Sequence, residues 1–373
     1  MMPEGLQYYI AVELIPSIGS ILAKRLIAYC GNVETIFTAS HTALQKIPGI
    51  GSILAHEIVS HRAAALKRAE RELLFIEEYK IKTYCYSSPE YSELLRQCED
   101  APVVFFAKGD IDFNRTKFLS IVGTRNATAY GRMVCEKIIG QLAERGHRLA
   151  IVSGLAYGID ICAHRAALQN NLDTVAVMAT GLNTIYPSAH TATARQIVEH
   201  GALVSDFVSD TKIDPKNFLK RNRIIAGLSA GTLVVESHLK GGALITAEIA
   251  TSYNREVMAV PGRIGDAASE GCNALVRKSN AAMVESAADV ENVLNWEQTV
   301  ASVPAKQLLL FDGLTAEEQQ IVALLREHGA PEEIGTLSYR TNIPTGRLSS
   351  LLFELELKGA VKTLPGNQYM LKT

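Results

Sequence analysis

The sequence predicts an α/β protein with an extended, Rossmann-like, mostly parallel sheet at its centre. Between residues 118 and 296, short runs rich in Val, Ile and Leu alternate with helical patterns. Such alternation is typical of parallel strands joined by helical crossovers and covered on both faces. Residues 1–66 show only short helical patterns, and residues 314–373 show three helical patterns followed by a hairpin. We therefore expect a helical domain before the sheet and a winged helix after it.

The central region, taken as residues 67–296 with its N-terminal extension, contains the predicted sheet. Its strands are expected at 119–122, 149–152, 174–178, 203–206, 232–235 and 256–260. Helices are expected between them at 130–144, 159–168, 189–199, 218–226 and 245–253. The extension, residues 67–118, contributes a helix near 66–79 and strands at 81–86 and 103–107. Ligands of parallel sheets bind beyond the carboxyl ends of the strands, so a site is expected there.

The N-terminal region contains two similar segments. Ile15–Gly19 reads Ile-Pro-Ser-Ile-Gly, Ile47–Gly51 reads Ile-Pro-Gly-Ile-Gly, and a helical apolar pattern follows each. Small residues suit a tight turn, and the helix that follows offers free backbone N–H groups. This is the pattern of a helix–hairpin–helix in a SAM-like domain. The turns either contact DNA phosphate or simply connect packed helices.

The C-terminal region follows a predicted linker at residues 297–313. In a winged helix the third helix, here residues 345–358, is the usual reader of a DNA groove. It carries Arg347 and Lys358 but also Glu354 and Glu356. Both DNA reading and a protein-contact or packing role remain open.

Composition restricts the classes of partner. The 373 residues have a formal net charge of −2 and an isoelectric point near 6.5, so any nucleic-acid site must be a local patch. The six cysteines form no C-x-x-C pair and no H-E-x-x-H occurs, which favours buried thiols and neither metal nor cofactor. The N-terminus lacks a leader pattern, and no apolar run reaches roughly 18 residues. We expect a cytoplasmic protein without a membrane partner.

Two predicted strands end in glycine-rich segments. Gly123, Thr124 and Arg125 follow the first strand, where glycine lets a backbone approach a ligand and arginine offers a fork matched to phosphate. Ser153–Gly158 follows the second strand and also fits an anion cradle. Neither segment is G-x-G-x-x-G, and no acidic residue is clearly placed for a ribose, so a dinucleotide site is disfavoured.

Asp160 and His164 lie four residues apart on one predicted helix face. They could form an acid–base pair. The favoured interpretation is an intrahelical hydrogen bond that holds the turn.

A basic run follows later in the chain. Lys212, Lys216, Lys220, Arg221 and Arg223 surround Phe218 and Asn222. An aromatic ring among cations suits single strands, because an unstacked base can lie on the ring while the cations hold phosphates. The alternative is a solvated basic face with Phe218 in the core. Further on, Gly241 and Gly242 precede another helix, and together these segments predict one ligand-binding rim.

These segments closely resemble the bacterial DNA-processing protein A family, also called DprA or Smf. The matching residues are 121–125 with 130–131, 153–160 with 164, 180–187, 221–229, 231–236, 241–248, and 260–262 with 271–273. The resemblance implies no catalytic residue. It implies a single-stranded DNA-binding homodimer, joined through the Rossmann-like domain, that protects incoming DNA and loads RecA recombinase in natural transformation and homologous recombination. Single-strand-binding protein is a further implied partner.

The resemblance and the basic run together give the candidate DNA-binding residues. These are Gly123, Thr124, Arg125, Ser153, Gly154, Gly158, Lys216, Phe218, Lys220, Arg221, Asn222, Arg223, Gly241 and Gly242. Thr124 stands where serine is common in the family, and Leu219 stands where proline often follows the phenylalanine.

Two other functions compete with this one. Gly231, Thr232 and Glu236 are similar to a signature of the lysine-decarboxylase-like nucleotide phosphoribohydrolases, although the spacing differs. A winged-helix transcription regulator with a nucleotide-sensing α/β domain is the second alternative.

Overall fold

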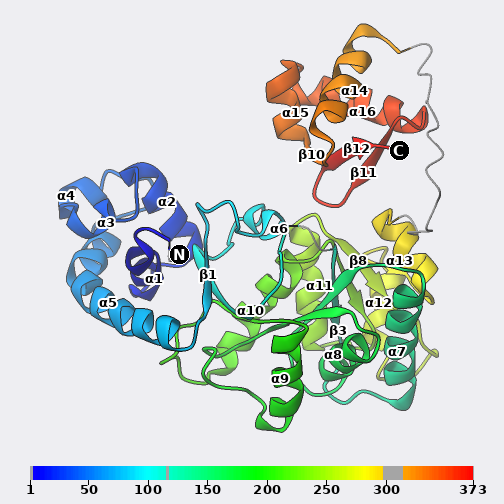
Figure 1. The fold of residues 1–373 in the computed structure, drawn as a ribbon, viewed down its shortest axis with the longest axis horizontal. Helices are drawn as coiled ribbons and strands as arrows, with labels where there is room; N and C mark the ends of the chain where they lie inside the picture. Colours follow the sequence, from blue (N-terminus) through cyan, green and yellow to red (C-terminus); the bar gives the residue numbers. More distant parts are fainter. Residues whose placement is uncertain (1–2, 115–116, 297–313, 373) are drawn as a thin grey trace.

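The computed structural model describes residues 3–114, 117–296 and 314–372. The linker predicted at 297–313 therefore lies outside the described residues. Figure 1 shows a helical N-terminal domain, a central domain built on a large sheet, and a small C-terminal domain. The predicted α/β class, Rossmann-like sheet and winged helix are confirmed.

The central sheet has nine strands in the order β1-β2-β6-β5-β4-β3-β7-β8-β9. β1 pairs antiparallel with β2, and β2 antiparallel with β6, while every pair from β6 to β9 is parallel. The strands are β1 Lys82–Cys85, β2 Val104–Gly109, β3 Lys117–Val122, β4 Leu149–Ser153, β5 Asp173–Val177, β6 Gly201–Ser205, β7 Gly231–Val234, β8 Glu256–Ala259 and β9 Ala282–Met283.

The strand order reverses between β3 and β7. From β3 the chain proceeds through β4, β5 and β6 on one side, and then returns to β7, β8 and β9 on the other. Such a reversal leaves a crevice beyond the carboxyl ends of the two central strands, where α/β proteins bind their ligands. The residues that follow β3 and β7 are thus the expected site.

Helices cover both faces of this sheet. Leu119 and Ile121 of β3 pack in one core cluster with α7, α8 and α13, while Phe118 and Val122 pack in another with α10 and α11. Because both faces of β3 are buried, its sequence shows an almost continuous apolar run. The helices of this domain are α6 Glu93–Arg96, α7 Ala129–Glu144, α8 Ile159–Gln169, η1 Ser188–His190, α9 Thr191–Glu199, α10 Pro215–Gly227, α11 Gly242–Ser252, α12 Glu270–Arg277 and α13 Ala287–Leu294.

The N-terminal domain consists of α1 Leu6–Leu14, α2 Ser20–Cys30, α3 Thr35–Thr38, α4 His41–Leu44 and α5 Ser52–Glu78. Its two similar turns share one geometry, because Ser17 and Gly49 have φ values of 65° and 84°, and Gly19 and Gly51 cap the helices that follow. The helix expected near 66–79 is the second half of the continuous α5. The domain boundary proposed at residue 66 lies inside that helix.

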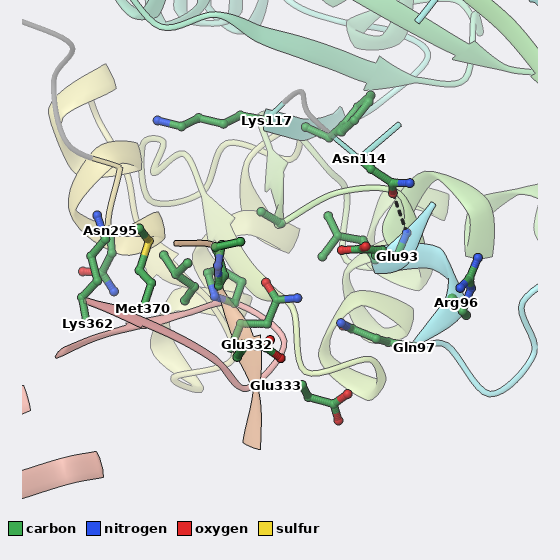
Figure 2. A pocket seen from close by; sticks show the side chains of 18 of the residues that line it. Glu93, Arg96, Gln97, Asn114, Lys117, Asn295, Glu332, Glu333, Lys362 and Met370 are labelled. Atoms are coloured by element: carbon green, nitrogen blue, oxygen red, sulfur yellow. Dashed lines mark hydrogen bonds between the residues drawn. The ribbon is translucent and has the colours of Figure 1, made fainter. Parts of the chain in front are cut away.

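The C-terminal domain has the helices α14 Ala316–His328, α15 Ile334–Thr341 and α16 Thr345–Leu357. Its sheet has the order β10-β12-β11, with β10 Glu332–Glu333, β11 Val361–Leu364 and β12 Gln368–Leu371. Gly366 and Asn367 have φ values of 85° and 55°, as the predicted hairpin turn requires. A cleft of about 1140 Å³ separates the hairpin from α6 and the start of β3 (Figure 2). Across one edge of it, Asn295 Nδ2 donates to the Thr363 carbonyl over 3.0 Å.

Candidate nucleic-acid interface

A pocket of about 230 Å³ lies at the strand reversal. Four segments form it: the turn after β3, the loop from β4 into α8, the middle of α10, and the loop from β7 into α11. Eight predicted site residues line it: Gly123, Thr124, Arg125, Phe218, Arg221, Asn222, Gly241 and Gly242. The fold thus gathers, in one place, residues that are more than a hundred positions apart.

The turn after β3 is fixed by Glu236. The Thr124 N–H donates to the Glu236 carbonyl over 2.8 Å, and the Thr128 N–H and hydroxyl donate to the two Glu236 carboxylate oxygens over 2.9 and 2.5 Å. The carboxylate is fully buried, and a Cβ on Gly131 would lie 2.2 Å from Oε2. Glu236 therefore occupies the N-terminus of α7, where a Rossmann fold would hold a pyrophosphate.

Hydrogen bonds made by the Ser153 and Asp160 side chains hold the loop after β4 in place. The Ser153 hydroxyl donates to the Ile121 carbonyl over 2.7 Å, and the Gly154 N–H donates to Asp160 Oδ2 over 3.2 Å. Ser153 is fully buried, and Gly158 lies against the Thr124 carbonyl, which a Cβ would approach to 2.1 Å. These residues shape the wall behind the pocket and do not line it, whereas Asp160 and Ala156 do.

His164 supports the same loop as a neutral ring. The Thr174 hydroxyl donates to the Ile151 carbonyl, so it accepts from His164 Nδ1 over 2.7 Å. Nε2 is then free to accept from the Leu155 N–H at 3.3 Å. Burial lowers the pKa of His164 to about 3, in agreement with this tautomer. Asp160 and His164 therefore hold the turn through separate bonds to the Gly154 and Leu155 N–H groups, and within the described residues the predicted intrahelical hydrogen bond between the two side chains is not found.

Arg221 is a buried cation with unused donors. Only 4% of it is exposed, and its guanidinium lies on the Gly154 backbone, where a Cβ would be 1.2 Å from Nη1. Within the described residues, its Nε and Nη1 have no hydrogen-bond partner. Burial lowers the pKa of Arg221 to about 10, the Asp160 charge opposes this shift, and the group stays protonated at neutral pH. Such a group favours an anion in the pocket.

The rim of the pocket combines a cation with aromatic rings. The Arg125 guanidinium carbon lies 5.6 Å from the centroid of the Phe218 ring, and the Tyr186 ring lies 5.5 Å from it in a T-shaped arrangement. Gly241 packs on Ser237, whereas a Cβ on Gly242 would meet nothing within 4 Å. The start of α11 is therefore open on this side of the pocket. Sequence reasoning did not identify Tyr186 as part of the rim.

Helix α10 divides the basic run between two surfaces. Asp214 caps its N-terminus by accepting from the Lys216 N–H over 2.8 Å, and Pro215 occupies its first turn. Phe218, Arg221 and Asn222 face the pocket at helical spacing. Lys220 and Arg223 instead line a groove beside the N-terminal domain, and Lys216 is exposed at the helix start, outside the pocket.

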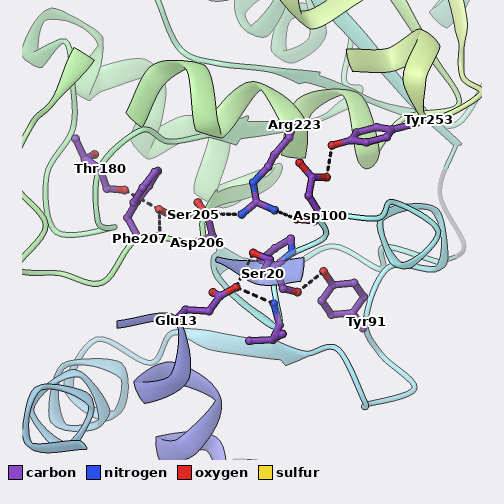
Figure 3. A network of polar contacts seen from close by, with 12 residues as sticks. Glu13, Ser20, Tyr91, Asp100, Thr180, Ser205, Asp206, Phe207, Arg223 and Tyr253 are labelled. Atoms are coloured by element: carbon purple, nitrogen blue, oxygen red, sulfur yellow. Dashed lines mark hydrogen bonds and ion pairs between the residues drawn. The ribbon is translucent and has the colours of Figure 1, made fainter. Parts of the chain in front are cut away.

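Arg223 is committed to protein partners (Figure 3). Its Nη2 pairs with the Asp206 carboxylate and its Nη1 donates to the Asp100 carbonyl. The Tyr253 hydroxyl donates to the Asp100 carboxylate. The placement of Arg223 as a pocket residue is therefore not what the structure shows, because its partners, distant in sequence, turn it away.

The winged helix also has its expected reader cations paired. Arg347 forms a double contact with Glu317, at 2.6 Å for the shorter bond, and Lys358 contacts Glu318 at 2.5 Å. Both carboxylates belong to α14. Each cation thus has a carboxylate beside it that a DNA phosphate would have to replace, although both cations remain exposed to solvent.

Several proteins similar to this chain belong to one family. The family model described as DNA recombination-mediator protein A matches residues 82–295, and that of the DprA winged helix domain matches residues 309–367. The Protein Smf of Escherichia coli is 35% identical over 316 residues, covering 82% of each chain. The DNA processing protein DprA of Bacillus subtilis is 38% identical over 238 residues, covering 61% of this chain and 79% of the relative.

Two solved structures are similar. DNA processing protein A from Streptococcus pneumoniae has a TM-score of 0.66 and 31% identity, covering 77% of this chain and 97% of that one. DNA processing protein A from Helicobacter pylori, described with its single-stranded DNA binding mode, has a TM-score of 0.52 and 27% identity, covering 58% and 96%. The chain therefore belongs to the DNA recombination-mediator protein A family, whose members are named DprA or Smf.

Proposed function

We propose that this protein binds single-stranded DNA in the pocket between β3 and β7 without cleaving or joining it. The observation that carries the proposal is Arg221, a buried guanidinium whose Nε and Nη1 lack partners within the described residues. A DNA phosphate supplies both the charge and the oxygen acceptors that this group lacks. Arg125 at the rim adds a second cation to the same pocket.

The pocket suits a strand of any sequence. Phosphate contacts position a nucleic acid but carry no sequence information. Phe218 can add sequence-tolerant stacking, because every base has a π-face. Related proteins are described as DNA processing proteins, and one is described by its single-stranded DNA binding mode.

The wider role rests on family resemblance. We infer that the protein acts in the cytoplasm as a homodimer joined through the Rossmann-like domain. There it protects incoming DNA and loads RecA recombinase onto it, with single-strand-binding protein as a further partner, in natural transformation and homologous recombination. The described helices agree with this to the extent that none is both long and apolar enough to cross a membrane.

A non-enzymatic role is part of the proposal. The glutamate that a nucleotide phosphoribohydrolase would need, Glu236, is fully buried and both its oxygens accept hydrogen bonds from Thr128. Such a carboxylate is occupied by Thr128, the residue that caps α7. Release of adenine from adenosine monophosphate by the wild-type protein would contradict the proposal.

The decisive measurement is a titration of the full chain with oligothymidine and with duplex DNA at several salt concentrations. Arg221→Ala should weaken single-strand binding by about 10- to 150-fold, the value of a charge-assisted hydrogen bond. The slope of log K against log salt should become shallower by roughly 0.7 for each phosphate that the variant no longer neutralises.

The matched control is Lys137→Ala, which removes an exposed cation midway along α7. It should leave both affinity and slope unchanged. A folded Arg221→Ala protein that binds oligothymidine as tightly as the control would show that Arg221 is structural.

A further inference from the structure

Tyr186 is an exposed aromatic residue beside the pocket. About 44% of it is exposed, although its neighbours Ile185 and Leu182 pack on a core cluster. The buried Tyr91, by comparison, donates its hydroxyl to the Pro102 carbonyl over 2.7 Å. Within the described residues, the Tyr186 hydroxyl has no such partner. Folding alone therefore gives little reason for an aromatic ring here.

Several close contacts hold the loop that carries Tyr186. The Thr180 hydroxyl donates to the Thr184 carbonyl and the Ser205 hydroxyl donates to the Thr180 carbonyl, each over 2.7 Å. Gly181 lies so close to the following segment that a Cβ would be 2.6 Å from the Val208 carbonyl oxygen. A ring on such a loop loses little freedom when it binds a ligand.

The Tyr186 ring continues the aromatic edge of the pocket. Its centroid is 5.5 Å from that of Phe218, and the interplanar angle is 68°. Arg125 lies over Phe218 at 5.6 Å and itself lines the pocket. Arg125, the Phe218 ring and the Tyr186 ring thus follow one another outward from the pocket.

We propose that Tyr186 is a second base-stacking subsite, which takes an unstacked nucleobase of the strand held by Arg221. The inference rests on the proposed function, since the phosphate pocket brings the strand to this edge. Cations and exposed rings in succession form the surface that single-strand-binding proteins use without sequence preference. The ligand is a nucleobase face, not a phosphate.

Substitutions at Tyr186 test whether its aromatic ring, its apolar volume or its hydroxyl group binds the base. Tyr186→Ala should weaken binding of a 15-mer oligothymidine by about 5- to 150-fold. Tyr186→Leu, which keeps apolar volume without a π-face, should weaken it nearly as much, and Tyr186→Phe should bind like wild type. Tyr29→Ala, which removes a 62% exposed tyrosine from α2, is the matched control and should bind like wild type.

An abasic oligonucleotide of the same length distinguishes stacking from phosphate contact. On this ligand the effect of Tyr186→Ala should disappear, while the effect of Arg221→Ala should remain. A direct readout is Tyr186→Trp in a Trp296→Phe background, which moves the single tryptophan of the chain to the subsite. Its fluorescence should be quenched by oligothymidine and not by the abasic strand.

The outcomes separate the two claims. If wild type and Tyr29→Ala both fail to bind oligothymidine, the proposed function is wrong and the subsite falls with it. If they bind and Tyr186→Ala and Tyr186→Leu bind equally well, the pocket stands and the subsite is overturned. An equal weakening by Tyr186→Ala on the abasic strand would also overturn it, because the ring would then act on the backbone.

Discussion

Arg221 and Gly154 work as a matched pair. The guanidinium can lie flat on the backbone because residue 154 has no side chain, and even alanine would bring a methyl group within 1.2 Å of Nη1. A planar fork suits this slot and a phosphate beyond it, whereas a lysine would offer a point charge on a flexible stem. Arg221 and Arg125 bring two positive charges to the pocket, and Asp160 brings one negative charge. The pocket therefore keeps an excess of positive charge for its ligand.

Glu236 is expected to be a stability residue. Glu236→Ala removes the acceptor of the Thr128 N–H and leaves a buried space beside Gly131, so it should lower the free energy of unfolding by about 2–4 kcal/mol. Glu236→Gln keeps the shape and one oxygen and should cost less. Urea unfolding measures both, with the exposed Glu248→Ala of α11 as control. Equal stability of Glu236→Ala and the control would contradict this structural role of Glu236.

Helix α10 serves two surfaces because of its period. Residues 218, 221, 222 and 225 line the pocket, whereas 220 and 223 point to the N-terminal domain. The same thirteen-residue helix thus lines the pocket and contributes to the domain contact. Its N-cap, Asp214, fixes where the first turn starts and hence which residues face the pocket.

The winged helix is expected to contribute little to DNA affinity. Arg347→Ala with Lys358→Ala removes two cations already paired with Glu317 and Glu318, so few DNA phosphates should lose a partner. The salt slope for single-stranded and duplex DNA should change by less than about 0.7, the share of one phosphate. The titration used for Arg221→Ala measures this. A clear weakening of duplex binding alone would instead assign groove reading to α16.

The strands and turns that depend on local sequence pattern could be predicted from the sequence. The central strands fall within two residues of their predicted positions, and the wing turn at residues 365–367 has the predicted backbone. The continuity of α5 was also readable, since no glycine or proline occurs between residues 52 and 78. Arg223 could not be assigned, because Asp100 and Asp206 reach it only through the tertiary fold. Tyr186 was missed for the same reason, as only the fold places its loop beside α10.

The N-terminal and central domains form one packed body at the edge of the sheet. One core cluster contains Ile10 and Leu26 from the helical domain together with Phe106 and Leu203 from β2 and β6. Polar contacts border it: the Ser20 hydroxyl and the Val103 N–H both donate to Glu13 Oε1, over 2.7 and 3.1 Å. Figure 3 shows Glu13 near the Arg223–Asp206 pair. The shared core and these contacts hold α10 against the helical domain.

Glu13 makes this contact sensitive to pH. Burial raises its pKa from 4.5 to about 7, the Arg223 charge opposes the shift, and Asp206 adds to it. The folded protein therefore holds a proton that the unfolded chain releases. Binding this proton favours the folded state. The contribution of Glu13 to the free energy of unfolding is fully present below pH 4.5 and is lost as the pH rises through about 7.

Glu13→Gln should remove this dependence. Near pH 4 the variant should match wild type, and near pH 8 it should be more stable by up to about 3 kcal/mol, because ionised Glu13 then destabilises wild type. Urea unfolding of both proteins at the two pH values measures the difference. Glu70→Gln, an exposed change on α5, should keep the wild-type pH profile. If the difference between Glu13→Gln and wild type is the same at both pH values, Glu13 does not titrate in this range and the domain contact depends on the Arg223 network alone.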